Sequence, residues 1–272
     1  MFKQVQNRAA SEFIFQVFAL IASLILVHAL YVTVIRPNAN AILEQQLAQE
    51  AAGESFVTER SFYIVVKDYE QEACFILMLW AFAIMGLKAR RSLNERKLLS
   101  EPLLQVAEGS RILPEDARQL SRPIQALSEE QQSYLLPRAL IAALQRFSST
   151  RNIQDVSNAV SDVCDSESDR MDTELSMVRY IAWAIPSIGF IGTVRGIGMA
   201  LTQAHRAVEG DITGVTAALG VAFNSTFVAL VISILLMFLM HQLQLQQERL
   251  VLDAQAYCDQ RLLGHLKVTR EV

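Results

Sequence analysis

Long apolar runs alternate with polar stretches along the chain, in a pattern that predicts helices crossing a membrane. The first run, residues 13–35, contains no formally charged side chain and is long enough as a helix to span a hydrocarbon core about 30 Å thick. A shorter run, residues 73–87, is followed at once by a basic cluster. Residues 180–203 and 214–240 form two further runs, of which the former is interrupted only by Arg195. The expected fold class is an all-α membrane protein with four transmembrane helices.

The polar stretch between the second and third runs, residues 88–179, is predicted to form a helical domain. Ser100 with Pro102, and Pro114, are typical of the first turns of helices. Residues 136–147 are amphipathic, as expected for a helix that buries one face. Apolar residues that follow keep a helical spacing of three or four: Ile153, Val156, Val160 and Val163.

A helix is also predicted to continue from near residue 152 directly into the third apolar run, because no proline occurs between residues 138 and 185. The tail, residues 241–272, is rich in Gln and Leu and is expected to extend the fourth run as a helix. Its expected packing positions are Leu243, Leu250 and either Leu262 or Leu263.

The distribution of charge predicts which side of the membrane each polar stretch occupies. A basic cluster directly follows the second run: Lys88, Arg90, Arg91, Arg96 and Lys97. Residues 36–72, in contrast, carry three basic and seven acidic side chains. Because cytoplasmic loops carry an excess of Lys and Arg, residues 88–179 are predicted to be cytoplasmic and residues 36–72 external. The N-terminus (1–12) and the tail (241–272) are then cytoplasmic, and the 204–213 loop is external.

Composition agrees with membrane residence and argues against several other classes of protein. Hydrophobic residues make up 52% of the 272-residue chain and charged residues 19%, which is unusual for a soluble domain. A net charge of −4 does not favour nucleic-acid binding. Cys74, Cys164 and Cys258 have no CxxC spacing, so they predict reduced thiols and no metal site. The sequence has no P-loop, nucleophile-elbow or H-E-x-x-H motif, so we expect neither an enzyme nor a cofactor.

The third and fourth runs are joined by about ten residues and are therefore expected to form an antiparallel hairpin. Small residues at helical spacing allow membrane helices to approach closely. The predicted packing positions are Gly189, Gly192 and Gly196 on the third run and Ala222, Ser225, Ala229 and Ser233 on the fourth. Thr193 and Thr226 lie among them. A buried threonine usually bonds the carbonyl four residues before it, so spacing alone leaves a structural and a functional interpretation open.

The segment IPSIGFIGTVRGIGMAL, followed about thirty residues later by ALGVAFNSTFVALVISI, resembles the MotA/TolQ/ExbB family of ion-driven motor channels. In that family a proline begins the first segment, and each of the two helices carries a threonine. The pattern falls on Pro186, Thr193 and Thr226 of this sequence. The resemblance covers residues 180–240, whereas the first 100 residues match the family only in topology.

The resemblance implies a homopentameric ring in the bacterial inner membrane, whose third and fourth spans line a pore around two copies of a MotB/TolR/ExbD-like partner. An aspartate in the single membrane span of that partner would bind and release the translocated proton or sodium ion, and Thr193 and Thr226 would line its path. None of the four apolar runs contains Asp or Glu, which agrees with an acid supplied by another chain. The alternative is a membrane scaffold that conducts nothing.

Two ionisable side chains inside the apolar runs need an explanation. Arg195 follows Thr193 by two residues, about 200° around a helix, so it faces away from a pore lined by Thr193. An arginine at a helix centre costs about 2.5 to 3.5 kcal/mol on insertion scales. It would either reach the external surface or, as we favour, form an ion pair at the external end of the second span. The candidate partners of Arg195 are Asp68, Glu70 and Glu72.

Functional and structural interpretations of His28, in the first run, both stay open.

Overall fold

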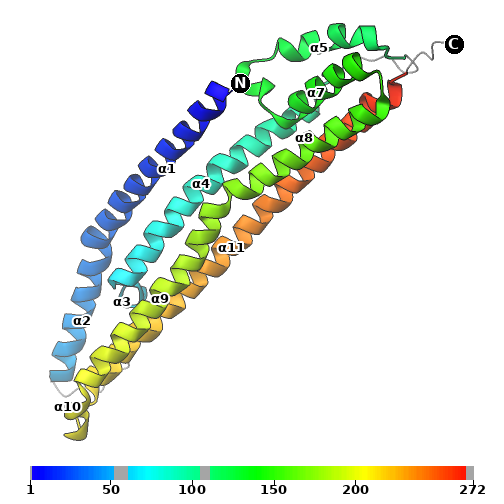
Figure 1. The fold of residues 1–272 in the computed structure, drawn as a ribbon. Coiled ribbons are helices and arrows are strands. Elements are labelled where there is room, and N and C mark those ends of the chain that lie inside the picture. The colour runs from blue at the N-terminus through cyan, green and yellow to red at the C-terminus, as the bar shows by residue number, and fades with distance from the viewer. Residues whose placement is uncertain (1, 52–60, 105–110, 268–272) are drawn as a thin grey trace. The chain divides into compact units, whose positions relative to one another are not determined.

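The computed structural model describes residues 2–51, 61–104 and 111–267 (Figure 1). Within these ranges the chain is helical and has no strand, apart from one isolated parallel bridge between Ile112 and Leu266. Four helical stretches in the described ranges are long and apolar enough to cross a membrane. The predicted all-α fold with four apolar spans is therefore confirmed.

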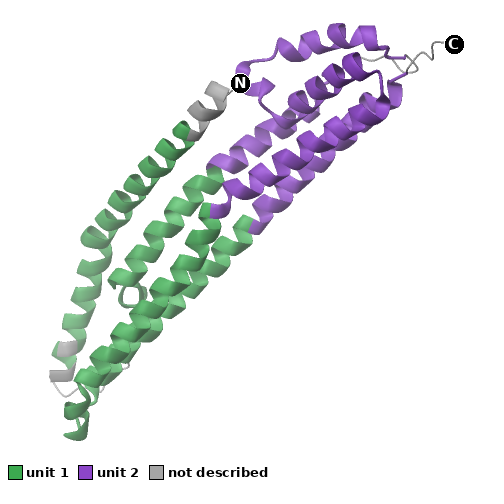
Figure 2. Cartoon of the chain, viewed as in Figure 1, with its two compact units in different colours: residues 1–86, 177–240 green, residues 87–176, 241–272 purple. Residues whose placement is uncertain are grey.

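The chain divides into two compact units, residues 1–86 with 177–240, and residues 87–176 with 241–272 (Figure 2). The first unit contains nearly all residues of the four apolar runs. Its helices are α1 (Phe2–Leu30), the π-helix η1 (Tyr31–Ile35), α2 (Arg36–Ala51), α3 (Phe62–Val66), the first part of α4 (Tyr69–Leu99), α9 (Ser176–Thr202), α10 (Ala204–Val208) and the first part of α11 (Thr213–Arg261).

Large apolar side chains are exposed along the helices of the first unit. Only 28–33% of the residues in each apolar window are buried inside the protein. An apolar surface of this extent is not stable in water and needs an apolar solvent. Examples of these exposed side chains are Phe13, Phe18, Leu26, Phe190, Phe223, Phe227 and Ile234.

The helix of the first span continues well beyond residue 35, where the apolar run ends. The Arg36 N–H bonds the carbonyl of Tyr31, five residues back, so the helix is widened into a π-helix just before Pro37. A proline lacks an N–H and its ring crowds the carbonyl four residues earlier, and a wider turn relieves that crowding. The helix then runs on as α2, so the first part of the predicted external segment is helical.

The second unit buries its core between several helices. It contains the second part of α4, the 3-10 helix η2 (Pro114–Asp116), α5 (Ala117–Gln125), α6 (Glu129–Gln132), α7 (Leu135–Thr150), α8 (Ile153–Glu174), the second part of α11 and η3 (Leu263–His265). The buried side chains include Leu140, Leu144 and Phe147 of α7, Val156, Val160 and Cys164 of α8, and Ala254, Cys258 and Leu262 of α11. The predicted amphipathic helices of this domain are confirmed, although Ile153 is exposed.

The structure differs from the predicted helices in two details. Ser100 does not begin a helix: residues 100–104 are not helical, because Pro102 disfavours helical backbone at Glu101 and α4 has ended at Leu99. The rest of that predicted helix, residues 105–109, lies outside the described residues. The helix expected from residue 152 into the third span is interrupted by a turn at Leu175, between α8 and α9.

The buried cysteines of the second unit lead to a prediction on their reactivity. Burial raises the pKa of Cys164 to about 11 and that of Cys258 to about 12. Since the thiolate is the reactive form, both thiols should resist iodoacetamide at pH 8 in the folded protein and react at once in denaturant. Peptide mapping by mass spectrometry measures this, and rapid labelling of either cysteine in the folded protein would show that the core opens.

Candidate functional site

The α9–α11 hairpin packs through its small residues, and the order of the contacts shows that the helices are antiparallel. A Cβ atom built on Gly189 would lie 2.6 Å from the Cβ of Ala229, and one built on Gly196 would lie 2.7 Å from the Cβ of Ala222. Between them, Gly192 faces the side chain of Ser225 at similarly close range. Each glycine thus removes a side chain that the partner helix would otherwise meet.

Gly196 offers a sharp test of this packing. A Cβ there would also lie 2.7 Å from the backbone nitrogen of Ala222, so Gly196→Ala forces the two backbones apart and should destabilise the protein by about 1–3 kcal/mol. Gly198→Ala on the same helix is the matched control, because nothing lies within 4 Å of its built Cβ. Thermal unfolding in detergent measures both, and equal melting temperatures would contradict the proposed contact.

Thr193 and Thr226 face each other across this hairpin, with their hydroxyl oxygens in hydrogen-bond contact. The Thr193 hydroxyl can also donate to the carbonyl of Gly189 at 3.3 Å and to that of Ala222 at 3.2 Å. The Thr226 hydroxyl can donate to the carbonyl of Gly189 at 3.1 Å. Since each hydroxyl has a single hydrogen, these four contacts share two hydrogens. The pair therefore has several alternative hydrogen-bonding patterns.

Pro186 and Ser233 are linked by a contact that sequence reasoning did not predict. Because Pro186 has no N–H, the carbonyl of Ala182, four residues before it, lacks its helical partner. The hydroxyl of Ser233 on α11 donates to that carbonyl at 3.0 Å. A serine facing a proline across a predicted hairpin is a signal that would have found it. Ser233 thus supplies the hydrogen bond that the Ala182 carbonyl lacks because Pro186 has no N–H.

Ser233→Ala should consequently lower stability by about 1 kcal/mol, since it leaves the Ala182 carbonyl unpaired away from water. Ser187→Ala is the control: the Ser187 hydroxyl bonds the Trp183 carbonyl of its own helix. The loss at Ser233 should disappear when Pro186 is replaced by alanine, which restores the missing N–H. Thermal unfolding of the single and double variants gives the coupling, and additive effects would refute the link.

The structure places Arg195 beside two of its three candidate partners. Its Nη2 atom lies 2.7 Å from Glu70 Oε2 and 3.7 Å from Asp68 Oδ1. Glu72 lies elsewhere: its carboxylate binds the guanidinium of Arg36 and, at 2.6 Å, Nδ1 of His28. His28 is thus bonded to a neighbouring helix.

Sequence reasoning did not predict that these acidic residues belong to the second long apolar helix and are buried. It began the second span at residue 73, whereas α4 begins at Tyr69, so Glu70 and Glu72 lie in the first turn of the helix. They are buried, and Gln71 between them is fully buried. Acidic residues are stabilised in the first turn of a helix by its dipole, which together with the uncompensated arginine is a signal for this arrangement.

Gln71 connects this turn to α11. Its Nε2 donates to the carbonyl of Val65 at 3.1 Å and to the hydroxyl of Ser225 at 3.4 Å. Ser225 directly precedes Thr226 in the chain. Gln71 of α4 therefore contacts the residue next to the threonine pair.

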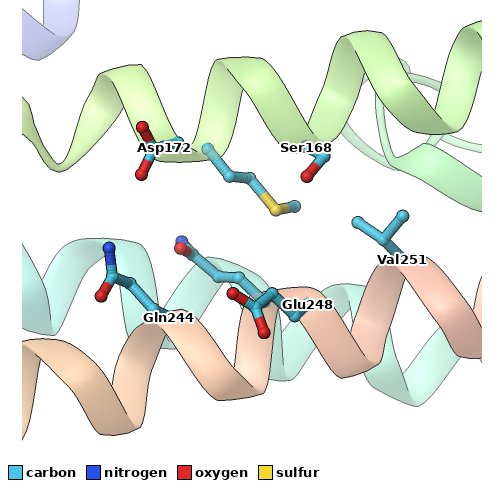
Figure 3. Close-up of a pocket in the computed structure, with 7 residues that line it drawn as sticks. Ser168, Asp172, Gln244, Glu248 and Val251 are labelled. Carbon is cyan, nitrogen blue, oxygen red and sulfur yellow. The ribbon is translucent and has the colours of Figure 1, made fainter.

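A pocket in the second unit is separate from these residues. Its lining comes from α8 and α11, with polar side chains from both helices (Figure 3). The residues are Ser168, Met171, Asp172, Gln244, Gln247, Glu248 and Val251. Among the described residues, no group of three or more His, Cys, Asp or Glu side chains is arranged to hold a metal ion.

The part of the chain that forms the hairpin also matches a known protein family. Residues 131–256 match the sequence model of the MotA/TolQ/ExbB proton channel family. This range contains both threonines and all the small residues of the hairpin, whereas α1 to α4 lie outside it. No curated protein and no solved structure shows a significant match to the chain.

The family match and the four apolar helices together indicate a multi-pass membrane protein. Residues 131–256 of the chain are therefore similar to the MotA/TolQ/ExbB proton channel family.

Proposed function

We propose that the protein is the pore-forming subunit of a rotary motor that converts the flow of protons, or of sodium ions, into mechanical work. The observation that carries the proposal is the pair of threonine hydroxyls, Thr193 and Thr226, in contact across the family-matched hairpin. Because two hydrogens serve four contacts, the pair can exchange donors without a change of backbone. Such a site can offer oxygen atoms to a passing hydrated proton or sodium ion.

The carboxylate that binds the ion is proposed to come from a partner. Neither α9 nor the part of α11 up to residue 240 contains Asp or Glu, and a titrating group inside a membrane is normally a carboxylate or a histidine. A MotB/TolR/ExbD-like protein with one membrane span would supply an aspartate. One charge that crosses about 100 mV releases about 2.3 kcal/mol, and each 1.4 kcal/mol or so changes a population tenfold, so a few ions suffice for a step.

The proposed assembly is a homopentameric ring around two copies of this partner, in the bacterial inner membrane. The basic residues after the second apolar run favour an orientation with residues 88–179 and both termini in the cytoplasm. The exposed apolar faces of the first unit supply the surfaces that lipid and neighbouring copies would cover.

Co-purification tests the assembly. The full chain would be expressed with the single-span protein encoded beside its gene, and native mass spectrometry of the membrane complex would count the subunits. We expect five copies of this chain with two of an aspartate-bearing partner. A complex without such a partner and with another stoichiometry would refute the proposal.

A second candidate function is a scaffold that conducts nothing, and one observation favours it. Each threonine hydroxyl can bond a helix carbonyl, so packing and hydrogen bonding alone account for both residues. The two candidates differ in what happens when the hydroxyls are removed.

A further inference from the structure

Three consecutive residues in the first turn of α4 contact three different parts of the first unit. Glu70, Gln71 and Glu72 are 9%, 0% and 6% exposed. Because neighbouring residues of a helix point about 100° apart, the three side chains leave the turn in different directions. Glu70 reaches α9, Gln71 reaches α11, and Glu72 reaches α1 and α2. Each direction can therefore be tested by its own substitution.

Glu70 contacts α9 on both sides of Thr193. Its carboxylate lies 2.7 Å from the guanidinium of Arg195, two residues after the threonine. Its Cγ atom would lie 3.2 Å from a Cβ built on Gly192, directly before the threonine. The ion pair and the close contact together fix the height and the rotation of α9 against α4.

Gln71 holds α11 in a corresponding way. The carbonyl of Val65 can only accept a hydrogen bond, so it determines that Nε2 of Gln71 faces it. The second hydrogen of the same amide then points to the Ser225 hydroxyl, which itself donates to the carbonyl of Val221 at 2.9 Å. The amide therefore sets the position of α11 one residue before Thr226.

Glu72 lies in the same helix turn as Glu70 and Gln71 and is also buried, but its side chain contacts the N-terminal helices. Both of its oxygens are engaged by the N-terminal helices, one by His28 and one by Arg36. The Arg36 guanidinium also lies over the ring of Tyr69, 4.3 Å from its centre. Glu72 is therefore a matched control for Glu70 and Gln71.

We propose that Glu70 and Gln71 are positioning residues for the Thr193–Thr226 pair: α4 holds α9 through the first and α11 through the second, and thereby sets the two hydroxyls against each other. Since hydrogen bonds weaken steeply with distance and angle, a small shift of one helix separates the pair. The role in conduction rests on the proposed function, but the positioning itself does not.

The test measures the distance between the two positions directly. In full-length protein whose Cys74, Cys164 and Cys258 are replaced by alanine, Thr193→Cys and Thr226→Cys are introduced together and oxidised in membranes. The rate of disulfide formation should fall about twofold to thirtyfold when Glu70→Gln or Gln71→Met is added, and should stay the same with Glu72→Gln. Gln71→Met keeps the size of the side chain and removes all its polar atoms, so it can preserve stability.

Parallel variants with native threonines are assayed for ion flux in proteoliposomes with the partner, at matched thermal stability. Flux should fall in Glu70→Gln and Gln71→Met by a factor similar to that of the disulfide rate. Equal disulfide rates in all variants, or an equal loss with Glu72→Gln, would overturn the positioning role. Altered disulfide rates together with an unmodified protein that conducts nothing would sustain the positioning role and refute the proposed function.

Discussion

Replacing Thr193 or Thr226 by valine is expected to reduce ion flux at least about tenfold while the protein still inserts and assembles. Valine keeps the branched shape of threonine and removes the hydroxyl. One lost hydrogen bond of about 1.4 kcal/mol at the proposed ion path corresponds to this factor. Flux into proteoliposomes that contain the partner gives the first quantity, and native mass spectrometry gives the second. Thr193→Ser and Thr226→Ser keep a hydroxyl and should retain most of the flux.

Thr216→Val is the matched control on α11. Its hydroxyl bonds the carbonyls of Ile212 and Thr213 in its own stretch of chain and does not touch the threonine pair, so its flux should equal that of the unmodified protein. If Thr193→Val and Thr226→Val both conduct as well as the unmodified protein, the hydroxyls serve packing alone. If the unmodified protein itself conducts nothing, the scaffold interpretation is correct.

Reversing the charge of Arg195 should have the second large effect. Arg195→Glu brings a third carboxylate against Asp68 and Glu70, which lie 3.7 Å and 2.7 Å from the guanidinium. Breaking a fully buried ion pair costs about 3–5 kcal/mol, and 38% of the Arg195 side chain is exposed. We therefore expect a loss of about 2 kcal/mol, seen as a lower melting temperature and less protein in the membrane.

A second charge reversal identifies the partner. Glu70→Lys combined with Arg195→Glu should recover most of the lost stability, because opposite charges again face each other. Glu72→Lys should recover none, since it would place its ammonium group against Arg36. Rescue by Glu72→Lys, or failure of both Glu70→Lys and Asp68→Lys to rescue, would disprove the ion pair observed here.

Local features of the sequence were sufficient to predict the helices and the hairpin. Apolar runs of membrane length predict spans, and Gly189, Gly192 and Gly196 predict a close contact, because both depend on residues near each other in the chain. The threonines came from the family resemblance. Their mutual contact depends on the register of two helices, which the hairpin leaves undetermined.

The partners of single polar side chains could not be predicted in the same way. Arg195 had three acidic candidates within five residues, and only the direction of each side chain in the first turn of α4 separates Glu70 from Glu72. The sequence alone does not explain the polar side chain of Ser233, because its partner, the Ala182 carbonyl, lies on another helix. Such pairings depend on how helices from distant parts of the chain are rotated against each other.

The ion pair of Arg195 also limits where the chain can be shortened. Arg195 lies inside residues 131–256, while Glu70 and Asp68 lie more than sixty residues before that range begins. A protein shortened to the homologous range would carry a guanidinium into lipid without its counterions, at a cost of about 2.5 to 3.5 kcal/mol on insertion scales. The range that matches the family and the range that can be stable by itself therefore differ in this chain, and transferring the α9–α11 hairpin into another protein requires the first turn of α4 as well.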